Sequence, residues 1–222
     1  MPPGSPSLNA YGYPLLIKHL LTKSNIASVC QEIVSGTDMR LSYADLGKRV
    51  CQLANSLKTE GILEGMRVGV MDWDTHRYLE CFFAIPMMGA TLFTINIRLS
   101  PAQVLYTINH SQSDLIIVHQ DFMTLIDDIK SGFNRDIIIL TIGNGEGYER
   151  WIGGASDSFD FPDFDENQTA TLFYTTGTTG KPKGVSYSHR QLVLHTLGLI
   201  AGFGAWPGNC LLYTSDAADD SQ

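Results

Sequence analysis

The chain has 222 residues, of which 44% are hydrophobic and 17% are charged, with a formal net charge of -8. This length and apolar content fit a globular chain with one large core and exclude a disordered one. The acidic balance argues against a nucleic-acid partner. No apolar run is long enough to span a membrane, so we expect no transmembrane segment. The first residues lack the cationic region of a signal peptide, so we expect none.

The cysteines indicate a reducing compartment. Cys30, Cys51 and Cys81 are widely spaced, form no C-x-x-C pair and lie within apolar patterns, while Cys210 lies near the end of the chain. This usage is typical of buried thiols in the cytoplasm rather than of a disulfide framework. We therefore expect a cytoplasmic protein.

Helical and strand-like patterns alternate from residue 42 onward. Ser42 and Asp45 form a capping box for a helix that continues to about Lys58, and Gly61 ends it. Ser100, Pro101 and Gln103 give a similar start to a helix that continues to about residue 110. One face of the first helix is apolar and consists of Leu46, Val50, Leu53, Ala54 and Leu57.

Short apolar runs between the helices predict a parallel sheet. The runs 115–119 and 137–142 are almost uniformly apolar and β-branched, as expected for strands that are buried on both faces. The whole pattern indicates an α/β fold, with a parallel or mixed sheet flanked by helices and ligands at the carboxyl ends of the strands. The other expected elements are strands over 67–71, 91–95 and 170–174, helices over 75–88 and 122–130, and a short helix over 148–153 inside a long connection from 143 to 168.

The most informative segment is the loop Tyr174–Gly184, Y-T-T-G-T-T-G-K-P-K-G, which combines threonines, glycines and lysines. Glycines let backbone N–H groups approach a ligand, hydroxyls add neutral donors and lysines supply positive charge, so the composition favours a polyphosphate ligand. The common P-loop pattern fails, because Pro182 or Val185 stands where its second glycine would be. A strand-like run, 185–188, follows instead of a helix. A turn of a surface hairpin is the plain alternative.

This loop resembles the signature loop of the adenylate-forming superfamily. The segments 71–90, 96–101 and 188–195 resemble its medium- and long-chain fatty-acyl-CoA synthetase branch. The resemblance extends from about Tyr13 to about Gly204 and implies the incomplete N-terminal portion of the adenylate-forming fold. Residues 1–204 would thus be the N-terminal part of an AMP-binding domain, with its phosphate loop at 174–184.

By this resemblance, the parent protein converts a fatty acid and ATP into an acyl-adenylate and pyrophosphate, and then transfers the acyl group to CoA. Thr175 matches the position whose hydroxyl helps to hold Mg²⁺, and Lys183 matches the family's cation. Lys181 is a weaker match, for which a solvated loop lysine is the plain reading. The residues that match the nucleotide site are Thr175, Thr176, Gly177, Thr178, Thr179, Gly180 and Lys183.

The resemblance also implies what this chain would lack. The CoA site, the ribose site, the hinge and the lysine of the mobile C-terminal domain should lie beyond residue 204, so we expect the chain to be inactive by itself. A homodimeric parent is compatible with the family. A ligase for a short acid or for methylthiopropionate is the alternative within the class, and a non-catalytic nucleotide-binding module is the alternative outside it.

The last residues do not follow the family pattern. Residues 210–220 resemble the translation of a transposase mosaic-end sequencing adapter, so we expect a non-native or disordered tail at 205–222, with a solvated acidic tail as the alternative.

Other polar residues are assigned plainer roles. His189 and Arg190 fit an anchor for a helix start about as well as a phosphate contact. No catalysis is expected of Asp72 and Asp74, and the remaining histidines have no metal-ligand spacing, which leaves structural roles for His76, His110 and His119.

Overall fold

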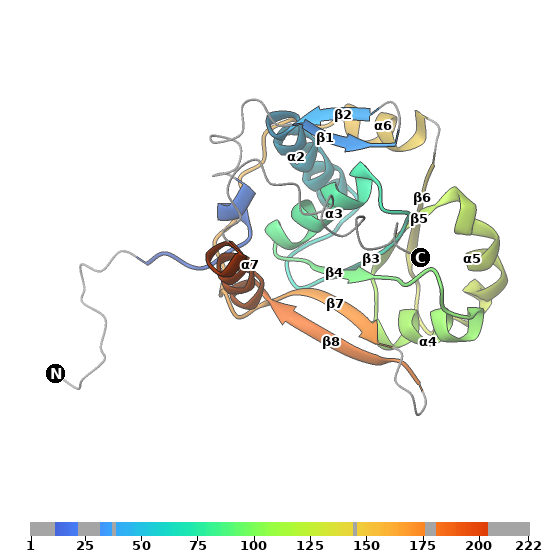
Figure 1. The fold of residues 1–222 in the computed structure, drawn as a ribbon. Helices are drawn as coiled ribbons and strands as arrows, with labels where there is room; N and C mark the ends of the chain where they lie inside the picture. Colours follow the sequence, from blue (N-terminus) through green and yellow to red (C-terminus); the bar gives the residue numbers. More distant parts are fainter. Residues whose placement is uncertain (1–11, 22–31, 37–38, 144–145, 176–180, 204–222) are drawn as a thin grey trace, which may run out of the picture.

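The computed structural model describes residues 12–21, 32–36, 39–143, 146–175 and 181–203, and Figure 1 shows their strands and helices. The expected tail at 205–222, Cys30 and Cys210 lie outside these residues. No helix in the described ranges is long and apolar enough to cross a membrane. The elements are β1 (Glu32–Ser35), β2 (Met39–Ser42), α2 (Tyr43–Thr59), β3 (Arg67–Met71), α3 (His76–Met87), β4 (Thr91–Thr94), α4 (Pro101–Ser111), β5 (Leu115–His119), η1 (Gln120–Phe122), α5 (Met123–Ile129), η2 (Lys130–Gly132), β6 (Ile138–Ile142), α6 (Glu146–Gly153), β7 (Thr169–Thr175), β8 (Lys183–Ser188) and α7 (His189–Phe203).

The described strands form one large mixed sheet and one small pair. The large sheet has the strand order β6-β5-β3-β4-β7-β8, and β1 and β2 pair with each other in antiparallel fashion. Strands β6, β5, β3, β4 and β7 are parallel, whereas β8 is antiparallel to β7 at the edge. The predicted α/β class, with a parallel or mixed sheet, is confirmed.

Helices α3 and α4 lie on opposite faces of this sheet (Figure 1). The chain passes from β3 to β4 through α3, and then from β4 back past β3 to β5 through α4. Because parallel crossovers are right-handed, two steps in opposite directions place their helices on opposite faces. The connections therefore diverge at the carboxyl ends of β3 and β4, which is where open α/β sheets bind ligands.

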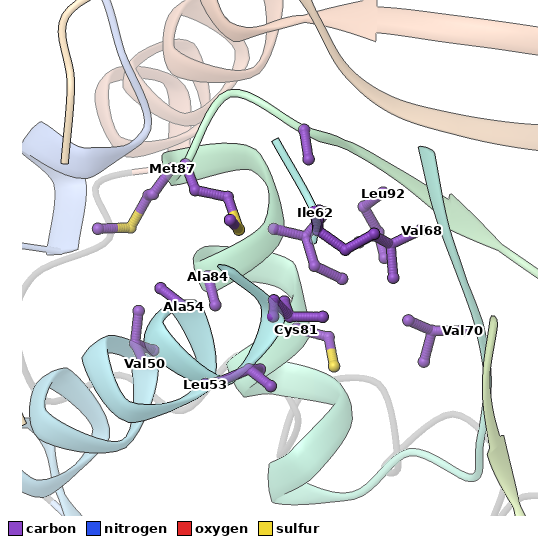
Figure 2. Packing of buried hydrophobic residues seen from close by; sticks show 14 of the residues in the cluster. Val50, Leu53, Ala54, Ile62, Val68, Val70, Cys81, Ala84, Met87 and Leu92 are labelled. Carbon is purple, nitrogen blue, oxygen red and sulfur yellow. The ribbon is translucent and has the colours of Figure 1, made fainter. Parts of the chain in front are cut away.

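Alternate residues of the central strands fill two separate cores. Val68 and Val70 of β3 pack with α2 and α3, whereas Met71 packs with α4 and α5. Figure 2 shows side chains of α2, α3 and β3 gathering in the first core. Gly69 faces the second core, where an added Cβ would lie 2.8 Å from Ile116 Cγ2. The sheet is thus held by apolar burial on both faces, at roughly 25 cal/mol per Å² of buried apolar surface.

Both predicted capping boxes are present. Ser42 Oγ accepts a hydrogen bond from the Asp45 amide at 3.1 Å, and Asp45 Oδ2 accepts one from the Ser42 amide at 3.3 Å. Ser100 and Gln103 make the same reciprocal pair at the start of α4. All the apolar residues predicted for one face of α2 are buried. Local capping chemistry therefore sets these helix starts.

The prediction that the run 137–142 is buried on both faces is wrong. Strand β6 has exposed positions, among them Ile138 with 43% of its surface accessible, whereas β5 is buried at every position. The difference follows from position, because β6 is at the edge of the sheet and pairs with β5 alone among the described strands. A β-branched apolar run does not by itself distinguish an edge strand from a central one.

Candidate functional site

The threonine- and glycine-rich loop connects β7 to β8 as the turn of a hairpin, as the strand-like run after it indicated. Residues 176–180 lie outside the described residues, so the structure places the loop through its two flanks. Thr175 ends β7, Lys183 begins β8, and the two are directly opposite in antiparallel register. Opposite residues of such a pair project from the same face of a sheet. Both are exposed, so the expected hydroxyl and the expected cation face solvent side by side.

This pair lies at the carboxyl edge of the parallel strands, the edge at which open α/β sheets bind ligands. Because β7 is parallel to β4, and β4 to β3, Thr175 is at the same edge as the carboxyl ends of both strands. A crevice of about 250 Å³ opens between the ends of β3 and β4. Its lining consists of Asp72, Trp73, Asp74, Tyr78, Ile95, Asn96, Ile97 and Arg98.

One of the aspartates in this crevice has a structural role. The Asp72 carboxylate accepts hydrogen bonds from the Trp73 amide at 2.8 Å and from Thr75 Oγ1 at 2.6 Å. Asp72 therefore fixes the turn between β3 and α3. A larger cavity of about 420 Å³ lies along the hairpin toward Arg67 and Thr91, which begin β3 and β4. Its lining includes Tyr174 and Gly184 of the predicted loop, whereas Thr175 and Lys183 are not among its lining residues.

Helix α4 contacts both flanks of the loop, which sequence reasoning did not predict. Tyr174 Oη lies 2.7 Å from His110 Nδ1. Lys181 Nζ lies 5.2 Å from the centroid of the Tyr106 ring, a cation–π distance. Burial raises the pKa of Tyr174 to about 12, so its hydroxyl stays neutral near pH 7 and can form the hydrogen bond. Lys181 is therefore held by a partner instead of being an unattached loop lysine.

The residues at the far end of β8 form a helix anchor. His189 is fully buried, its Nδ1 accepts a hydrogen bond from the Ile17 amide at 3.4 Å, and burial lowers its pKa to about 4. Arg190 is paired with Glu166. His189 directly follows the six-residue strand β8, so it lies about 20 Å along the strand from Lys183, at roughly 3.3 Å per residue. The geometry thus favours the anchor over a phosphate contact.

No group of three or more His, Cys, Asp or Glu side chains in the described ranges could hold a metal ion. His76 and His119 each lie near one carboxylate, those of Glu149 and Asp121, in agreement with structural roles. The Thr175 hydroxyl fits Mg²⁺ in a different way. Mg²⁺ commonly takes one or two protein ligands, together with substrate phosphates and water. Thr175 is exposed and is suited to one such ligand.

A charged network joins α2, α3 and α6, away from the hairpin, and it also escaped prediction. Arg49 lies 2.6 Å from Glu80 and 2.7 Å from Glu149, and Tyr148 Oη donates to Glu80 at 2.5 Å. The His76 imidazole, whose Nε2 lies 3.6 Å from Glu149 Oε1, and the hydrogen bonds that Arg49 donates lower the pKa of Glu149 to about 2. The network fastens α6 to the helical layer. A glutamate at position 80, inside an otherwise apolar helix, is the sequence signal that could have revealed it.

The sequence profile of a family described as AMP-binding enzyme matches residues 22–215. The long-chain-fatty-acid–CoA ligase of Thermus thermophilus is 35% identical over 174 residues, which cover 76% of this chain and 32% of the relative. The 3-methylmercaptopropionyl-CoA ligase of Ruegeria lacuscaerulensis is 33% identical over 198 residues, which cover 82% of this chain and 37% of the relative. The chain spans about a third of the length of these relatives.

The fold is also similar to solved structures. The anthranilate CoA ligase AuaEII, solved in complex with anthranoyl-AMP, superposes with a TM-score of 0.75 at 24% identity. The superposition covers 84% of this chain and 36% of that chain. At this identity the likeness concerns the fold, and it agrees with the α/β sheet described above.

Proposed function

The chain belongs to the AMP-binding enzyme family, and we propose that it is the N-terminal part of an ATP-dependent acid–CoA ligase. In this reaction a carboxylate oxygen bonds to the α-phosphorus of ATP, pyrophosphate leaves, and the acyl group then passes from AMP to the thiol of CoA. The observation that carries the proposal is the pairing of Thr175 with Lys183 on the two sides of the threonine- and glycine-rich loop.

The hairpin would supply what this chemistry requires of a protein. Charge on the β- and γ-phosphates has to be held while the carboxylate attacks, and pyrophosphate must still be released. Backbone N–H groups and threonine hydroxyls of the loop would bind the phosphates as neutral donors. Lys183 would add one positive charge, and Thr175 would offer its hydroxyl to Mg²⁺. When bound, Mg²⁺ would neutralise part of the negative charge of the phosphates.

The acid is proposed to be a fatty acid. The sequence segments after β3 and before α4 resemble the fatty-acyl branch, and a fatty-acid ligase is among the relatives. A short or sulfur-containing acid such as methylthiopropionate is the alternative, which the Ruegeria relative supports at nearly equal identity. A panel of acids, assayed for acyl-CoA formation by the complete protein, distinguishes the two.

A non-catalytic nucleotide-binding module is the alternative from another class, because the chain covers about a third of its relatives. The reading frame of the source DNA separates the two hypotheses. Continuation into ribose-binding and hinge motifs supports the ligase, whereas a genuine stop soon after residue 204 supports the module. For the ligase we propose a cytoplasmic location, which the free thiols of Cys51 and Cys81 support, and leave a homodimeric parent open.

The proposal is tested in the protein encoded by the complete reading frame. Thr175→Ala and Lys183→Ala should each lower adenylate formation by roughly 10²-fold, as expected for the loss of one charge-stabilising group. Exposed residues outside the hairpin provide the controls, Thr59→Ala and Lys130→Ala, which should retain activity. Pyrophosphate release at the wild-type rate in both loop variants would contradict the assignment.

The 222-residue chain by itself should form neither acyl-adenylate nor acyl-CoA from any acid. The expected CoA site and C-terminal lysine would belong to other parts of the parent, while phosphate binding by the hairpin would be retained. Turnover of ATP and a fatty acid by the purified chain would contradict this part of the proposal.

A further inference from the structure

The two flanks of the loop depend on one face of α4. Tyr106 and His110 are four residues apart, so they lie on the same side of the helix, and their rings are 5.5 Å apart. His110 contacts Tyr174, which directly precedes the exposed Thr175, and Tyr106 contacts Lys181, which follows residues 176–180. One helix face therefore reaches the chain both where it enters the loop and where it leaves it.

Helix α4 is a rigid support for these contacts. It starts in a capping box at Ser100, and Val104 and Ile108 are fully buried in the core on the α4 side of the sheet. Tyr174 is fixed further by Phe93 of β4, whose ring is 5.4 Å away and nearly perpendicular. A loop tied at both ends to a buried framework loses less conformational freedom when it binds a ligand.

We propose that Tyr106 and His110 are positioning residues of the phosphate loop: His110 fixes the entering strand through Tyr174, and Tyr106 fixes the leaving segment through Lys181. This inference rests on the proposed function of the loop. It also gives the two lysines different roles, because the ammonium of Lys181 is directed onto the Tyr106 ring while Lys183 is opposite Thr175. Lys183 would then bind phosphate directly, and Lys181 would act through Tyr106.

A double-mutant cycle on the 222-residue chain tests these separate roles of Lys181 and Lys183. Inorganic pyrophosphate is the probe, and calorimetry measures its binding. Tyr106→Leu and Lys181→Ala should each weaken binding about three- to fivefold, the size of a partly exposed cation–π contact. The double variant should be no weaker than either single one, because both changes remove the same contact. Multiplying effects would mean that Lys181 binds phosphate itself, and would overturn its assignment.

Conservative variants separate positioning from general packing. Tyr106→Phe retains the ring, and His110→Asn retains a polar atom near the place of Nδ1, so both should bind pyrophosphate nearly as the wild type does. His110→Ala, in contrast, should bind pyrophosphate more weakly than the wild type does. Two variants serve as matched controls. Asn109→Ala removes a side chain of the same helix that forms hydrogen bonds with Gly132 and Asn134. Phe159→Leu removes a ring that forms a cation–π contact with Lys58. Equal weakening by the controls would overturn the inference.

A second measurement needs no ligand. Amide hydrogen exchange at Thr175 and Lys183 should become about three- to fivefold faster in Tyr106→Leu and His110→Ala, while exchange in β5 is unchanged. Unchanged exchange at the two flanks would overturn the inference. Absence of pyrophosphate binding by the wild-type chain would instead contradict the proposed function. Hydrogen exchange would then be the measurement that tests whether Tyr106 and His110 hold the two flanks.

Discussion

Strands β5 and β8 belong to the same sheet and differ in what holds them. β5 lies between the parallel strands β3 and β6, and all five of its residues are buried. β8 pairs with β7, and its six residues are exposed or half-buried. The position of β5 therefore follows from apolar burial, while that of β8 depends on hydrogen bonds to β7 and on contacts at its ends. The centre of the sheet supplies stability, and the edge leaves polar groups exposed.

The largest effect on stability is expected at the most deeply buried positions of the central strand. Ile116 of β5 is fully buried, so Ile116→Ala should lower the free energy of unfolding by about 2–5 kcal/mol through lost burial and a residual cavity. Tyr187 of β8 is 41% exposed, and Tyr187→Ala should cost less than about 1 kcal/mol. Urea unfolding of both variants measures the difference. Similar losses would mean that the edge strand is held as firmly as the centre.

An intermediate effect is expected from the charged network, through pH. The pKa of Glu149 is lowered from 4.5 to about 2, so the folded state binds this proton less readily than the unfolded state. The stabilisation is thus complete above about pH 4.5 and is lost as the pH falls toward 2. Because the carboxylate is partly exposed, we expect about 1–2 kcal/mol after allowing for solvent screening.

Unfolding of Glu149→Gln across this pH range measures that contribution. The variant should be less stable than the wild type near pH 6, and the two should converge near pH 2. Glu32→Gln is the matched control, because Glu32 forms an exposed ion pair with Arg40. A constant gap between wild type and Glu149→Gln over the range would show that the carboxylate does not titrate as described.

The smallest effect on stability is expected on α7. Leu194, Leu197 and Ile200 recur at intervals of three residues, and each is at least 45% exposed. Replacing Leu197 and Ile200 with Gln should change the free energy of unfolding by less than about 0.5 kcal/mol, because little burial is lost. The same change should reduce self-association, which light scattering detects, since exposed apolar stripes favour aggregation. A large loss of stability would show that the stripe is covered in solution.

The elements that sequence patterns predicted well are those set by local chemistry. Ser42 with Asp45 and Ser100 with Gln103 define helix starts through bonds three residues apart, which a sequence displays directly. The burial of β6 was not predicted correctly, because its exposure depends on where the strand lies in the sheet. Sheet order is a property of tertiary structure.

The site was predictable in part for the same reason. The composition of the loop makes its residues candidates, and the register of β7 and β8 brings Thr175 and Lys183 together. The support from α4 was not predictable, because His110 and Tyr174 are separated by 64 positions and meet through the order of the strands. Contacts of this kind leave no local pattern in the sequence.

The most direct test of the account is a calorimetric titration of pyrophosphate into the 222-residue chain, into Lys183→Ala and into Lys130→Ala. If the exposed edge of the sheet is a phosphate site, the wild type binds, Lys183→Ala binds about tenfold more weakly through loss of a charge-assisted hydrogen bond, and Lys130→Ala binds as the wild type does. Equal binding by Lys183→Ala and the wild type would contradict the assignment of this hairpin to phosphate.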